Sequence, residues 1–285
     1  MRAVCMFFLL LVFTLSANGD TTEYTVSTQE EFLNAIGPDR TIVIAEGEII
    51  IVEIPQSAEG ERPVFPSSHP NQYLEWESVH DGVSLMIYGV ENLTIRGSGE
   101  LASSILTEPR YSYVMDFHGC SGIHIKNLVI GHTPDGFCDK GVLSFAGCTD
   151  VEVDGCDLFG CGVLGLDLER TRGFTFSNSV IRDCTYGIMV FRNSGDLLFE
   201  NSVFIDNEEF FGVEMIRCTD VVLQNCLFEN NITNSYSALF DFTFCEDITL
   251  QDCIIRDNTC EEIFSDIEVV TLIDVALENN RLTAD

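Results

Sequence analysis

The sequence repeats itself with a period close to 23 residues through most of its length. Six copies open on a short segment beginning with Cys, Thr or Ser, and successive starts lie 28, 23, 23, 24 and 27 residues apart. The copies start at Cys120, Cys148, Thr171, Ser194, Cys218 and Cys245, with a weaker copy at Val90 and an incomplete one at Ile267. This period indicates a solenoid, in which each copy forms one coil and contacts its neighbours.

Each copy carries the same internal pattern. Two apolar residues alternate with polar ones, as in Ile123 and Ile125, which predicts a half-buried strand. A residue that tolerates the left-handed region follows, and two further apolar segments complete the copy. The column of turn residues is Gly97, Asn127, Gly155, Asn178, Asn201, Asn225, Asp252 and Asp274. The pattern predicts an all-β fold: a single-stranded, right-handed parallel β-helix with three short strands per coil.

Cysteine usage fits the same fold. Cys5 lies in the N-terminal apolar segment, which leaves eleven cysteines beyond it. Most of them occupy columns where other copies carry Ser or Thr, so we interpret them as buried free thiols. Disulfides between stacked pairs such as Cys218 and Cys245 are the alternative. A metal site at Cys156, Cys161 and Cys184 is a third interpretation, which no C-x-x-C pair supports.

The N-terminus predicts export. Residues 1–19 carry Arg2, an apolar core and a small-residue cleavage site, which is typical of a secretory signal peptide. Residues 20–285 are then one β-helix domain, with the N-terminal cap and first coil in 20–54. A capping box at Ser27 to Glu30 begins a short α-helix that covers the first coil. No comparable cap is predicted at the C-terminal end. These features predict a secreted, extracellular, periplasmic or cell-surface protein.

Net charge limits the partners. The formal charge of −32 disfavours nucleic acid, anionic membrane surfaces and polyanionic sugars without a bridging cation. No later segment is long and apolar enough to span a membrane. The charge is either a solvated acidic surface or a set of Ca2+ sites. No cofactor is required by any motif, and the sequence leaves the oligomeric state open.

The sequence resembles the right-handed β-helix proteins of the pectate-lyase-like superfamily. The resemblance covers roughly Tyr24 to Asn280 and rests on the opening segment 26–36 and on repeats such as 125–128 and 223–226. It implies the fold and leaves the chemistry open, because this superfamily contains lyases, hydrolases, epimerases and adhesins. The catalytic motifs of polygalacturonases, alginate epimerases and pectate lyases are missing, apart from an isolated His118-Gly119.

Three longer segments are predicted to project at one corner, just before the third strand: Pro55–His80, Gly99–Ser112 and Gly131–Lys140. They would border the outward face of that strand, where related β-helix enzymes place their clefts. The candidate catalytic residues on this face are Asp116, His118, Asp167, Glu169 and Arg192. The candidate ligand-binding residues are Trp76, Tyr88, Arg110, Tyr111, His132 and Asp135. We also expect a surface ion pair between Glu169 and Arg192.

Three functions remain open at this point. The first is a solenoid that binds carbohydrate, such as a polysaccharide or cell-surface glycan, or another surface ligand. The second is a polysaccharide lyase or glycoside hydrolase, in which paired carboxylates act as acid and base. The third is a structural surface or assembly protein joined through its C-terminal end. The sequence does not decide whether the chain is an enzyme.

Overall fold

The computed structural model describes residues 21–52, 70–99, 102–133, 140–160, 164–208 and 210–283. The predicted signal peptide, Asp135 and Cys161 lie outside the described residues. Within these ranges, no helix is long and apolar enough to cross a membrane.

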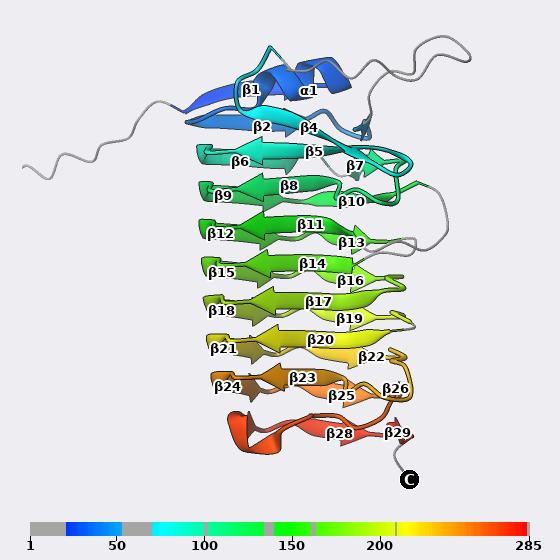
Figure 1. Ribbon diagram of the computed structural model, residues 1–285. Coiled ribbons are helices and arrows are strands. Elements are labelled where there is room, and N and C mark those ends of the chain that lie inside the picture. The colour runs from blue at the N-terminus through cyan, green and yellow to red at the C-terminus, as the bar shows by residue number, and fades with distance from the viewer. Residues whose placement is uncertain are drawn as a thin grey trace, which may run out of the picture.

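The described chain forms a right-handed parallel solenoid of about seven turns with three long sheets, as predicted (Figure 1). Sheet A contains β1 (Thr22–Val26), β2 (Arg40–Ile44), β6 (Glu91–Gly97), β9 (Ser121–Lys126), β12 (Thr149–Asp154), β15 (Arg172–Ser177), β18 (Gly195–Glu200), β21 (Thr219–Gln224), β24 (Glu246–Gln251) and β27 (Val270–Ile273). Sheet B contains β3 (Ile49–Ile51), β7 (Ser103–Thr107), β10 (Leu128–His132), β13 (Asp157–Phe159), β16 (Val180–Arg182), β19 (Val203–Ile205), β22 (Leu227–Glu229), β25 (Ile254–Arg256) and β28 (Ala276–Glu278). Sheet C contains β4 (Leu74–Val79), β5 (Gly82–Tyr88), β8 (Met115–His118), β11 (Gly141–Ala146), β14 (Leu164–Glu169), β17 (Gly187–Arg192), β20 (Phe211–Ile216) and β23 (Phe240–Thr243).

The predicted register holds from coil to coil. Ile125 pairs with Val153, which pairs with Phe176, and each of these side chains is buried. The predicted turn column also holds from Asn127 to Asp274, where every residue has a positive φ of 50–63°. Gly97 is the exception: it belongs to β6, and Gly99 takes the positive φ of 80° in its place.

One predicted insertion is wrong in extent. We expected Gly99–Ser112 to be a single projecting segment, but it contains β7, which pairs with β3 and β10 in sheet B. Only the part after Thr107 lies at the corner before sheet C. The described end of the first insertion forms β4, which pairs antiparallel with β5 and extends the edge of sheet C.

The mixed columns of Cys, Ser and Thr share one hydrogen-bonding role. Cys148 Sγ donates to the carbonyl of Phe117 in the preceding coil at 3.4 Å, and Thr171 Oγ1 does the same to Phe145 at 2.8 Å. The interpretation of free thiols is confirmed for the nine cysteines that the described residues contain. Burial raises the pKa of Cys156 to about 12, so that this thiol stays protonated.

A buried asparagine ladder was not predicted. Asn207, Asn231, Asn258 and Asn280 stack at the corner between sheets B and C. Each side chain accepts from the backbone N–H of the residue one coil before it and donates to a carbonyl of that coil. These bonds satisfy polar groups that would otherwise be buried without partners.

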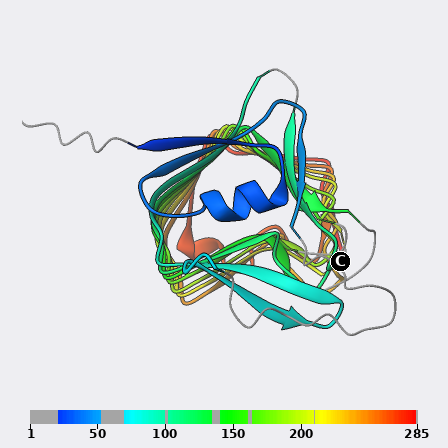
Figure 2. The same cartoon turned by 90° about the horizontal axis from the view of Figure 1, so that it is seen from above.

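The helix α1 (Gln29–Ala35) lies across the N-terminal opening of the solenoid, as Figure 2 shows. It buries Phe32, Leu33 and Ala35 against the first coil. The cap sits one residue later than predicted: the Thr28 hydroxyl accepts from Glu31 N, and the Glu31 carboxylate accepts from Ser27 N at 2.9 Å. An N-terminal helix is therefore confirmed, with Thr28 as its N-cap.

The last coil leaves apolar side chains uncovered. It contains β27, β28 and β29 (Arg281–Leu282), follows η1 (Ile267–Val269), and pairs β29 with β26 (Thr259–Cys260) of the preceding coil. Leu272 and Leu277 pair in register with the fully buried Leu250 and Ile255, yet both are exposed. The core column therefore continues to the end of the described solenoid without a covering element.

Candidate functional site

The outward side chains of sheet C form two columns, which we call the sheet C ladder. The first column is Met86, Asp116, Ser144, Asp167, Val190, Glu214 and Asp241. The second column is Tyr88, His118, Ala146, Glu169, Arg192, Ile216 and Thr243. The structure thus brings the five candidate catalytic residues to one face, in the order in which the repeat placed them.

Asp116, His118 and Tyr88 form one cluster at the N-terminal part of the ladder. His118 Nε2 lies 3.0 Å from Asp116 Oδ2, and the Tyr88 ring stacks on the imidazole with 4.9 Å between centroids. The Asp116 carboxylate raises the pKa of His118, even though partial burial opposes the charge. The Asp116 side chain is only 7% exposed, and its Oδ1 has no hydrogen-bond donor among the described residues. The cluster combines an aromatic face with a paired, titratable histidine.

Asp167 is the centre of a second cluster, two coils further along. Tyr113, which precedes β8, donates its hydroxyl to Asp167 Oδ2 at 2.7 Å, and Arg192 Nη1 lies 3.2 Å from Asp167 Oδ1. Burial raises the pKa of Asp167 despite these two donors, and burial beside Asp167 raises the pKa of Tyr113. The position of Tyr113 was missed by the sequence analysis, because this residue lies outside the repeat pattern.

The prediction of an ion pair between Glu169 and Arg192 is wrong, because each of them pairs with a different residue. The two residues are adjacent in register, but Arg192 reaches diagonally to Asp167 and lies 3.9 Å from Glu214. Glu169 pairs with Arg170 at 2.9 Å instead. The diagonal geometry arises because the Asp167 carboxylate is more buried and so gains more from a cation.

The predicted ligand-binding residues do not share one environment, unlike the candidate catalytic residues. Trp76 packs partly against the core, Tyr111 lies beside His80 with 5.1 Å between ring centroids, and Arg110 Nε lies 3.9 Å from Asp81. His132 is completely buried and its Nε2 lies 3.1 Å from the Ser112 carbonyl, so its predicted contact with ligand does not fit the structure. Burial lowers the pKa of His132 to about 4.

The pH response of His118 gives a direct check of the first cluster. Its folded pKa is raised, so the His118–Asp116 pair contributes fully below the unfolded histidine pKa of about 6.5. That stabilisation is lost as the pH rises through the folded value. We expect Asp116→Asn to lower the pKa of His118, as measured by NMR titration of the ring protons. Glu200→Gln on sheet A is the control and should leave this titration unchanged; an unmoved His118 pKa in Asp116→Asn would contradict the pairing.

Metal binding receives no support from the described residues. They contain no group of three or more His, Cys, Asp or Glu side chains arranged to hold a metal ion.

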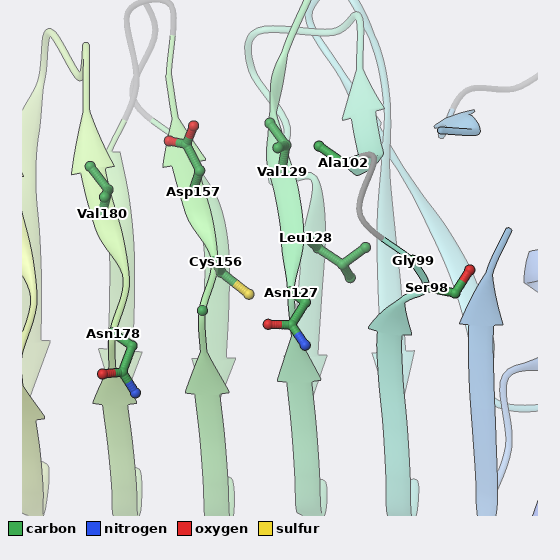
Figure 3. A pocket seen from close by; sticks show the side chains of 11 residues that line it. Ser98, Gly99, Ala102, Asn127, Leu128, Val129, Cys156, Asp157, Asn178 and Val180 are labelled. Atoms are coloured by element: carbon green, nitrogen blue, oxygen red, sulfur yellow. The ribbon is translucent and has the colours of Figure 1, made fainter. Parts of the chain in front are cut away.

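A groove of about 330 Å3 lies elsewhere, at the corner between sheets A and B (Figure 3). Asn127 and Asn178 line one side, and Val129 and Val180 line the other. Asp157, within the groove, is held by Arg182 at 2.9 and 3.0 Å. Among the described residues that line the groove there is no aromatic side chain, and their one carboxylate, Asp157, is paired with Arg182, so the sheet C ladder offers more chemistry for a ligand.

Family comparison agrees with this geometry. The model of a family described as the right handed beta helix region matches residues 115–282, more than half of the chain. The chain belongs to the right-handed β-helix family. No curated protein matches the sequence.

Solved structures share the fold of this β-helix at low identity. It is similar to the pectate lyase of Paenibacillus sp. 0602, with 9% identity over 93% of this chain and 79% of that chain, and a TM-score of 0.56. It is also similar to the pectin methylesterase of Aspergillus niger, with 11% identity over 95% of this chain and 88% of that chain, and a TM-score of 0.50. At these identities the likeness is one of fold alone.

Proposed function

We propose that this β-helix binds carbohydrate on the sheet C ladder. The observation that carries the proposal is the stack of Tyr88 on His118 beside Asp116 and Asp167 on one outward face. Aromatic rings pack against the apolar faces of sugars, while carboxylates and imidazoles accept or donate hydrogen bonds to hydroxyl groups. The fold shared with proteins that act on pectin is consistent with a carbohydrate ligand.

A second candidate function is glycan cleavage on the same face. Asp116 and Asp167 occupy one column with Ser144 between them, which places their Cα atoms about 9.6 Å apart at the usual strand spacing. Inverting glycosidases hold their two carboxyl groups about 6.5–9.5 Å apart, with room for a water, so Asp116 and Asp167 would form such a pair if their side chains lean toward each other. Asp167, whose pKa is raised by burial, would be the acid of such a pair.

A glycan array with the purified protein tests both functions. Binding to at least one glycan class that is lost in Tyr88→Ala supports the proposal. Incubating each hit with the protein and assaying for new reducing or unsaturated ends then separates binding from cleavage. Absence of binding to every glycan, with a folded protein by circular dichroism, would overturn the proposal.

The exposed end of the solenoid favours a third candidate, an assembly protein. Leu272, Leu277 and Leu282 are exposed in the last coil of the described solenoid. Light scattering over a range of concentrations tests this function, because end-to-end association gives a mass that rises with concentration. A monomer at all concentrations would exclude it.

We also propose that the protein is secreted after removal of residues 1–19. The support is the composition of that segment. Expression of the full chain and N-terminal sequencing of the product should give a mature chain that begins near Asp20. Retention of Arg2 in the mature protein would contradict export by this route.

A further inference from the structure

One corner of the solenoid carries exposed aromatic side chains in three successive coils. Tyr186 lies just before β17, Phe210 just before β20 and Tyr236 in the turn before β23, where sheet B leads into sheet C (Figure 1). Phe210 is 44% exposed and Tyr236 is 86% exposed, while Tyr186 and Phe211 are half-buried. We call these four side chains the aromatic corner. It borders the sheet C ladder, because Phe211 begins the strand that also carries Glu214.

Ring contacts and hydrogen bonds hold the aromatic corner in place. The ring centroids of Tyr186 and Phe210 lie 5.3 Å apart, and Phe211 meets Tyr186 edge-on at 5.3 Å. Phe211 N donates to the Tyr186 carbonyl at 3.4 Å, and Asn234 N donates to the Phe210 carbonyl at 3.2 Å, so the coils are joined here. Asn234 Oδ1 accepts from Tyr236 N at 2.9 Å, which fixes the turn that presents the Tyr236 ring. A ligand would therefore meet a surface that needs little ordering on binding.

The exposed area of the aromatic corner suits a small ligand. Since an aromatic side chain offers about 150–250 Å2, Phe210 and Tyr236 together expose roughly 200–300 Å2. A stable protein–protein interface buries about 800 Å2 on each partner, well above this area. Sugar rings present small apolar C–H faces, so a glycan fits the aromatic corner better than a folded protein does.

The charges around the aromatic corner disfavour an anionic ligand. The described residues that form it include no Lys or Arg in segments 183–187, 206–211 and 230–239. Glu208 is exposed two residues before Phe210. In the adjoining ladder, burial raises the pKa of Glu214; Arg192 opposes this rise and the charge of Asp241 adds to it. A sugar carboxylate or sulfate would therefore meet like charges at this corner without a cation to pair with.

We propose that the aromatic corner stacks the sugar rings of a neutral glycan. This inference rests on the proposed carbohydrate-binding function, to which it adds a second contact surface and a class of ligand. Aromatic rings pack on the apolar faces of neutral sugars, and Tyr186 and Tyr236 add hydroxyl groups that bond to sugar hydroxyls. Because Tyr186, Phe210 and Tyr236 follow one another in successive coils, the glycan runs along the solenoid axis beside the ladder.

The test is isothermal titration calorimetry with hexasaccharides. The neutral probes are cellohexaose, xylohexaose and mannohexaose, together with any neutral glycan retained on the array, and the anionic probe is a galacturonate hexamer with and without Ca2+. We expect at least one neutral probe to bind, with an affinity that changes by less than about twofold between low and high salt, since no charge pair forms. The galacturonate hexamer should not bind in either condition.

Three substitutions locate the effect. Phe210→Ala and Tyr236→Ala should each weaken binding of the neutral probe about fivefold, the loss of one stacking contact. Phe210→Tyr keeps a ring and should bind within about twofold of the unsubstituted protein. Circular dichroism checks that Phe210→Ala is folded, and Tyr236→Ala gives an independent reading because its ring is 86% exposed.

Phe244→Asn is the matched control. It removes a ring that is 79% exposed at the opposite corner of sheet C, between β23 and β24, and asparagine tolerates the φ of 56° found there. The affinity for the neutral probe should be unchanged in this variant. A loss equal to that of Phe210→Ala would show that exposed rings act without regard to their place, which overturns the inference.

The outcomes separate this inference from the proposed function. Binding confined to the galacturonate hexamer or other anionic glycans would overturn the ligand class and leave carbohydrate binding standing. Unchanged affinity in both Phe210→Ala and Tyr236→Ala, with binding lost in Tyr88→Ala, would overturn the aromatic corner and leave the ladder standing. Failure of every probe, together with an empty glycan array, would overturn both.

Discussion

Phe204→Ala is expected to lower the free energy of unfolding by about 3–5 kcal/mol. Phe204 is fully buried in the centre of the solenoid, and its ring stacks on Phe228 with 4.5 Å between centroids and on Phe176 with 6.1 Å. Truncation leaves a cavity between coils that the hydrogen-bonded backbones on either side cannot close. Urea denaturation followed by circular dichroism measures the change.

Tyr236→Ala is the matched control for that experiment. Its ring is 86% exposed, so its removal should change the free energy of unfolding by no more than about 0.5 kcal/mol. A loss below about 1 kcal/mol in Phe204→Ala would mean that the aromatic stack between coils is not packed as described.

Asn231→Leu is expected to destabilise the protein by about 2–6 kcal/mol, since it removes the four hydrogen bonds of a buried side chain. The Asn231 side chain accepts from Asn207 N at 3.2 Å and donates to the Phe204 carbonyl at 2.9 Å. Leucine fills much of the space but can make neither bond. Thermal and urea denaturation both report the loss, and native-state hydrogen exchange should show a less protected Asn207 amide.

Asn225→Gly is the control for the asparagine ladder, because it removes an exposed asparagine from the same coil as Asn231. Asn225 has a φ of 51°, which glycine adopts without strain, so we expect a much smaller change than in Asn231→Leu. If the two variants are equally stable, the buried ladder does not have the stabilising role assigned to it.

The sequence predicted the coil architecture because the same pattern of strand and turn residues recurs in every copy. Alternating apolar pairs and a turn column from Asn127 to Asp274 fix both the strands and the register, so that the order of ladder residues could be read before the structure. Segments that occur once were harder to predict. β7 belongs to sheet B, but the segment between its turn and the strand differs in length from that of the other coils. β4 pairs antiparallel with β5 and has no counterpart in the repeat.

Side-chain contacts at the site could be predicted only in part. The repeat placed Asp167 and Arg192 on one face, but it could not show that Arg192 reaches diagonally past Glu169. Tyr113 was missed because it precedes β8 and no periodic position marks it. His132 was predicted to bind ligand because it falls in the expected insertion Gly131–Lys140. In the structure β10 extends through His132 and the ring is buried.

Carboxyl footprinting by mass spectrometry tests the central claim most directly, because it reports which face a bound glycan covers. The protein is labelled with a carbodiimide and an amine, with and without the tightest-binding oligosaccharide. We predict reduced labelling of Glu169, Glu214 and Asp241 on sheet C, and unchanged labelling of Glu152 and Glu200 on sheet A. Protection of the sheet A carboxylates without protection on sheet C would contradict the assignment of the ladder as the binding surface.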